Sequence, residues 1–162
     1  MLFKFRRFPQ RESNGMSDAL FYQLNECRFN LPHADVQDAS INILKFAELG
    51  TSLIVSRSVL EEGETLRSNF DGQLKRLGQQ VEAFRFQLAE SGGVGAEQDV
   101  EALEIQSQFS RGADQVFQYQ LAFLRPGTRQ MLALSYVKPQ PLSDADAVHW
   151  AAIKTSLRLS SV

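Results

Sequence analysis

The sequence is poor in the residues that build metal centres and covalent cross-links. It has one cysteine, Cys27, and two histidines, His33 and His149, among 162 residues. One cysteine cannot form a disulfide within the chain, and a cysteine-based zinc site needs several. The two histidines are far apart in the sequence and have no metal-ligand spacing. We therefore expect neither a metal ion nor another cofactor.

Motifs that carry catalysis are also missing. The glycine-rich stretch 91–95 lacks the lysine and hydroxyl residue that end a phosphate-binding loop. No Gly-x-Ser-x-Gly nucleophile elbow is present. Cys27 could pair with His33 or His149, but a lone cysteine in a strand is more often a small apolar residue than a nucleophile. The sequence therefore predicts that the protein is not an enzyme.

Long hydrophobic runs are absent. No stretch reaches the roughly 18 apolar residues of a membrane span. The first residues interleave Phe3, Phe5 and Phe8 with cations, without the apolar run of about 7–15 residues that a secretory signal needs. We therefore expect a cytoplasmic protein that does not insert directly into a membrane.

Charge is distributed unevenly along the chain, although the net charge is only -2. Residues 1–15 carry four basic side chains and one acidic side chain, whereas the rest of the chain carries 13 basic and 18 acidic ones. The acidic body argues against nucleic acid as the partner. The basic segment is either an arm that touches a membrane or an acidic partner, or a disordered extension before a start at Met16. We favour a disordered extension over 1–15 followed by a single domain over 16–162.

The hydrophobic pattern alternates between the period of strands and the period of helices. Period-two segments predict strands at 40–46, 52–57, 84–88, 101–109, 116–124 and 129–137. A predicted helix carries its apolar residues at Leu66, Phe70, Leu74, Leu77 and Val81. A last helix should begin at Ser143, which resembles a capping box with Asp146. The expected fold class is α+β, a twisted antiparallel sheet of about six strands with two main helices.

Several predicted strands are apolar on both faces. On the strand 40–46, Ile41 and Ile43 share one face while Leu44 and Phe46 share the other. The same pattern recurs at 116–124 and 129–137. Either helices cover both faces of the sheet, or one face is a partly open apolar groove, dotted with Gln and Ser, that awaits a partner or a second copy. The pattern alone leaves both interpretations open.

Three segments of the chain resemble the DcrB-like family, which has the PsbP/Mog-like fold. They are residues 25–32, 38–46 and 53–57. The most specific piece is Asp-x-Ser-Ile-Asn-Ile-x-Lys at 38–45. Within the family, the chain most resembles the Eag chaperones, which are adaptors of type VI secretion effectors. The resemblance covers about residues 20–160 and leaves out 1–15.

The resemblance implies a cytoplasmic homodimer that binds the N-terminal transmembrane helices of a PAAR/Rhs-type effector and aids its loading. It also implies that Ile41 and Ile43 line the client-binding groove, although isoleucines in a strand are more often sheet core. The strand faces suggest five weaker additions, Gln118, Gln120, Ala122, Leu132 and Leu134. The alternative is a PsbP/Mog-like regulatory or assembly module that binds a folded protein through a polar surface.

Overall fold

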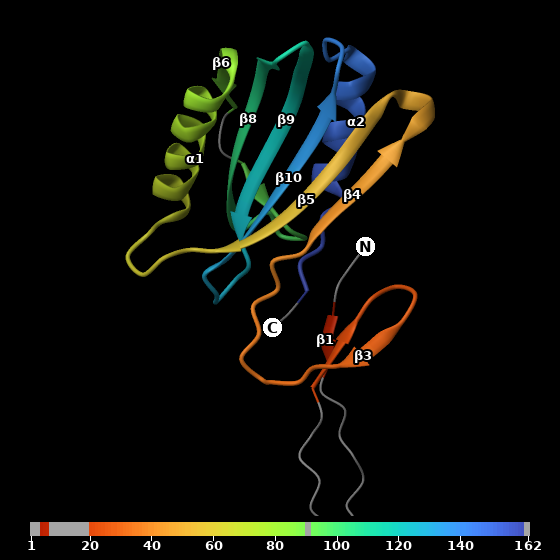
Figure 1. Cartoon of the computed structure of the whole chain (residues 1–162), viewed down its shortest axis with the longest axis vertical. Coiled ribbons are helices and arrows are strands. Elements are labelled where there is room, and N and C mark those ends of the chain that lie inside the picture. Colours follow the sequence, from red (N-terminus) through yellow and green to blue (C-terminus); the bar gives the residue numbers. More distant parts are fainter. Residues whose placement is uncertain (1–3, 7–19, 90–91, 161–162) are drawn as a thin grey trace, which may run out of the picture. The chain divides into compact units, whose positions relative to one another are not determined.

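The computed structural model describes residues 4–6, 20–89 and 92–160. These residues belong to two compact units, 1–38 and 39–162. The larger unit contains the main sheet and both helices (Figure 1).

The smaller unit contains a three-stranded antiparallel sheet. Its strands are β1 (Lys4–Arg6), β2 (Phe21–Gln23) and β3 (Arg28–Asn30), with β2 in the middle. The disordered extension predicted over 1–15 contains β1 among the described residues. The alternation of aromatic and basic residues there is the period of a strand. The rest of 1–15 lies outside the described residues.

The larger unit is built on a seven-stranded antiparallel sheet. In spatial order its main strands are β4 (Ile41–Phe46), β5 (Thr51–Val59), β10 (Gln130–Lys138), β9 (Asp114–Leu124), β8 (Val100–Arg111) and β6 (Glu82–Leu88). A short turn of 3₁₀ helix, η1 (Ala47–Leu49), connects β4 to β5. Two helices complete the unit, α1 (Leu66–Gln80) and α2 (Asp144–Thr155). The predicted α+β class, with six main strands and two helices, is confirmed.

One strand was not anticipated from the sequence. No strand is predicted between 88 and 101, but Gly93–Val94 form β7, which pairs with β8. A Cβ at Gly93 would lie 1.7 Å from the carbonyl oxygen of Gln98. Only glycine fits there, so its presence marks a close backbone approach as well as a turn.

The two helices lie on opposite faces of the sheet (Figure 1). On one face, Phe70 and Leu74 of α1 pack against Ile105, which is fully buried. On the other face, Trp150 of α2 stacks on Tyr119, with ring centroids 5.8 Å apart. The strand residues that complete the α1 core are Leu103, Ala122, Met131 and Ala133, and those that complete the α2 core include Leu53, Leu121, Phe123, Leu134 and Tyr136.

A buried carboxylate anchors the start of α2. Asp146 accepts hydrogen bonds from the Tyr136 hydroxyl at 2.9 Å and from the backbone N–H of Ser143 at 2.8 Å. It also forms an ion pair with Lys138 at 2.7 Å. The capping box predicted for Ser143 and Asp146 is present. Burial raises the pKa of Asp146, but Lys138 and these hydrogen bonds outweigh it and hold the pKa well below its usual value.

The substitution Asp146→Asn should destabilise the fold by about 2–3 kcal/mol near neutral pH, because it removes charged hydrogen bonds in a buried site. The folded-state pKa of Asp146 is depressed, so its contribution is fully present above the unfolded pKa of about 3.9. This contribution is lost as the pH falls further, through the folded-state pKa. Urea unfolding of wild type and variant should show a stability difference at about pH 7 that shrinks at about pH 3. A difference independent of pH would contradict this assignment.

Candidate functional site

Part of the α1 side of the sheet has no described helix over it. Helix α1 contacts β6, β8 and β9, and so lies toward one edge of the sheet. Strands β10, β5 and β4 continue beyond it, and Figure 1 shows them uncovered in front of α2. The strand pairing assigns a set of residues on four strands to this side, which we call the open face: Ile41, Ile43, Lys45, Ser52, Ile54, Ser56, Ser135, Val137 and Gln120.

Apolar and polar residues occupy different parts of the open face. At the β4 edge, Ile41 is 62% exposed and Ile43 is 57% exposed. Ile54 on β5 lies opposite Ile43 and widens this apolar part. Ser135 on β10 and Gln120 on β9 lie opposite each other and form a polar, uncharged band nearer to α1. The open face therefore combines exposed isoleucines with an uncharged polar band, and the exposed Lys45 adds a positive charge near the end of β4.

The structure divides the residues suggested from the sequence into two groups. Ile41, Ile43 and Gln120 lie together on the open face. Gln118 and Ala122 point to the same side but are 7% and 1% exposed. Gln118 donates a hydrogen bond to Ser107 at 3.1 Å, and Ala122 lies in the core beneath α1. Both are therefore buried and offer little surface to a partner.

Leu132 and Leu134, which the sequence suggests as groove residues, lie on the opposite face of the sheet from Ile41 and Ile43. The pairing of Leu134 with Val55 and Leu121 places both leucines on the α2 side of the sheet. There they contribute to the core around Trp150. Residues that alternate along a strand point to opposite faces, and the sequence does not show which face of 129–137 aligns with Ile41.

The register also identifies residues that the sequence analysis missed. Ile54, Ser56 and Ser135 share the open face with Ile41 and Ile43. The alternation of 52–57 separates Ile54 and Ser56 from Leu53 and Val55, which is the only sequence signal for them. Their proximity to Ile41 depends on strand pairing.

Arg57 ties the beginning of β4 to β5 from the α2 side of the sheet. Its Nη1 donates to Asn42 Oδ1 at 2.8 Å and to Ser40 Oγ at 3.3 Å. A further bond reaches the Ser40 carbonyl oxygen at 3.4 Å. Ser40 and Asn42 are the chain neighbours of Ile41, so these hydrogen bonds hold the edge strand that carries the exposed isoleucines.

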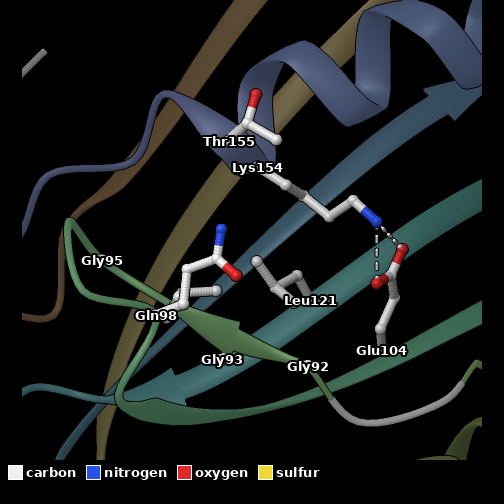
Figure 2. A pocket seen from close by; sticks show the side chains of 9 residues that line it. Gly92, Gly93, Gly95, Gln98, Glu104, Leu121, Lys154 and Thr155 are labelled. Carbon is white, nitrogen blue, oxygen red and sulfur yellow. Dashed lines mark hydrogen bonds and ion pairs between the residues drawn. The ribbon is translucent and has the colours of Figure 1, made fainter.

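A separate cavity of about 250 Å³ lies on the α2 side (Figure 2). Its charged groups are paired with each other, because Lys154 Nζ lies 2.7 Å and 2.9 Å from the two carboxylate oxygens of Glu104. Trp150 Nε1 also donates to Glu104, at 2.6 Å. This cluster binds α2 to β8. Over the described residues, no group of three side chains could hold a metal ion.

Comparison with known proteins identifies the family. A family model described as DcrB matches residues 26–156. The chain belongs to the DcrB family. This confirms the resemblance that the motif at 38–45 suggests.

One solved structure supports the fold of this DcrB-family chain. It is PA94 from Pseudomonas aeruginosa, described as a protein of unknown function and a candidate regulator. The TM-score is 0.65 at 21% sequence identity, with 88% of this chain and 97% of the other covered. No curated protein matches the chain. In the part of the chain that the structure describes, no helix is long and apolar enough to cross a membrane.

The substitution Arg57→Ala should loosen β4 and lower the free energy of unfolding by about 1–2 kcal/mol, because it removes hydrogen bonds made by a half-buried charged group. Hydrogen exchange should accelerate at the β4 amides that pair with β5. Lys45→Ala, an exposed change at the other end of β4, is the matched control. Unchanged exchange in β4 of the Arg57 variant would show that these bonds do not hold the edge strand.

Proposed function

We propose that this DcrB-family protein is a cytoplasmic chaperone or adaptor for apolar helices of a client protein. The proposed client is a type VI secretion effector of the PAAR/Rhs type, whose N-terminal transmembrane segments need cover before export. The observation that carries the proposal is the exposure of Ile41 and Ile43 beside an uncharged polar band. The conclusion extends the adaptor or regulator role that DcrB family membership suggests.

Hydrophobic burial supplies the driving force in this proposal. A transmembrane segment of about 20 apolar residues aggregates or inserts wrongly if it stays in water. Contact with Ile41, Ile43 and Ile54 removes apolar surface from water on both sides, at about 25 cal/mol per Å². Ser135 and Gln120 can form hydrogen bonds of the kind that hold helices together in a membrane.

The dimensions of the open face suit a helix. Strand β5 has nine residues and is therefore about 30 Å long. This is also the length of a helix of about 20 residues. The four strands from β4 to β9 span about 14 Å at the usual strand spacing, enough for a helix about 10–12 Å wide. The proposal includes a homodimer, in which a second copy offers a second open face.

The double substitution Ile41→Asp with Ile43→Asp should reduce client capture at least tenfold, because it places two carboxylates where the client's apolar surface would be buried. The experiment is an affinity purification of the tagged full chain from its native cytoplasm, followed by mass spectrometry. Wild type should capture a large protein with N-terminal transmembrane segments, and the double variant should lose it.

Val148→Asp is the matched control, because Val148 is 67% exposed on α2, on the other side of the sheet. This variant should capture the client as wild type does. Circular dichroism and oligomeric state should be the same in all three proteins. Loss of folding or of the dimer in the double variant would show that Ile41 and Ile43 are structural. Equal capture of folded partners alone by all variants would favour a regulatory module that binds through a polar surface.

A further inference from the structure

Helix α1 borders the open face with side-chain amides. Its buried side carries Leu66, Phe70 and Leu74. A Cβ at Gly78 would lie 3.2 Å from Phe84 of β6, so this flank of the helix faces β6. Asn69 lies nine residues earlier and, at about 100° per residue, projects about 180° away from Gly78.

The opposite flank of α1 therefore faces the uncovered strands. Strand β6 ends the sheet on one side of α1, while β10, β5 and β4 continue on the other side. The flank opposite Gly78 carries Asn69, Gln73, Arg76 and Gln80, at successive spacings of four, three and four residues. Three amides and the exposed Arg76 thus line the border between α1 and the open face.

A chain of hydrogen bonds orients two of these amides. Glu64 accepts a bond from the backbone N–H of Glu61 at 2.8 Å and from Asn69 Nδ2 at 3.2 Å. Gln73 Nε2 then donates to Asn69 Oδ1 at 2.7 Å. Because Gln73 uses its amide nitrogen toward Asn69, its carbonyl oxygen is turned away from Asn69, and no hydrogen bond from a described side chain reaches that oxygen. Gln73 is half-buried, so its orientation is restricted.

We infer that Gln73 is a specificity-determining residue of the client site. Helix α1 then forms a border that selects which side of a bound client helix faces it. This inference rests on the proposed function. The isoleucines at the β4 edge accept the apolar side of the helix. Gln73 and Gln120 accept a side that carries hydroxyl or amide groups without charge. A helix that is apolar all round would leave the Gln73 carbonyl oxygen buried and unpaired, which weakens binding.

The test compares two labelled synthetic helices in a mild detergent. One contains about 20 leucine and alanine residues between lysine ends. The other is identical except for three serines on one face, spaced four and three residues apart. Fluorescence anisotropy with the full wild-type chain should show a preference of about tenfold for the serine peptide.

The variant Gln73→Leu should bind the leucine–alanine peptide at least as tightly as wild type does and lose the preference for serine. Gln79→Leu is the matched control, because Gln79 is exposed on the side of α1 that points away from the sheet. This control should keep the preference. Gln79→Leu should unfold at the wild-type temperature because it changes an exposed residue. Gln73→Leu removes the hydrogen bond to Asn69, so its unfolding temperature should fall by only about 2–4 °C and the variant should stay folded in the assay.

The possible outcomes separate the inference from the proposed function. Binding of both peptides by wild type without a preference would overturn the inference and leave the proposed function standing. A preference that survives in Gln73→Leu, or that disappears equally in Gln79→Leu, would also overturn the inference. Binding of neither peptide by wild type would overturn the proposed function itself, and the inference with it.

Discussion

The pairing of β10 with its two neighbours is the constraint on which the rest of the structure depends. Eight residues of β10 pair with β5 and eight pair with β9. This register directs Ala133 and Ser135 toward the α1 side and Leu134 and Tyr136 toward the α2 side. A slip of one residue would exchange these sets and place Tyr136 outside the core that contains Trp150. The open face exists because the register holds small and polar residues together on one side.

The two helices cover their faces of the sheet unequally. Helix α2 is fixed by aromatic packing around Trp150 and by the buried carboxylate of Asp146, so its face is closed. Helix α1 packs over β6, β8 and β9 and over the Met131–Ala133 part of β10, and leaves the same side of β5, β4 and the end of β10 without a described helix over it. The cost of this arrangement is exposed apolar surface at Ile41 and Ile43, which is expected where a partner binds.

The ion pairs among the described residues lie on the α2 side of the sheet, opposite the open face. The ion pairs Lys138–Asp146 and Lys154–Glu104 join α2 to strands on the closed side. The open face instead offers isoleucines, a valine, serines and a glutamine, with Lys45 near the end of β4 that lies away from Ile41. Such a surface suits an apolar helix with an uncharged polar side, because buried hydroxyl and amide groups need partners but a charge would need a counter-charge.

Local patterns in the sequence determined most of the secondary structure of this protein. Hydrophobic periodicity gave six main strands and two helices close to their observed bounds, and Ser143 with Asp146 gave the start of α2, because each signal lies within a few consecutive residues. The motif at 38–45 indicated the DcrB family. Only the tertiary structure decided which strand faces lie on the same side of the sheet. Ile54 and Ser135 lie on the same side as Ile41, whereas Leu132 and Leu134 lie on the opposite side. Alternation along one strand defines two faces, but the pairing of strands far apart in the sequence decides which faces meet.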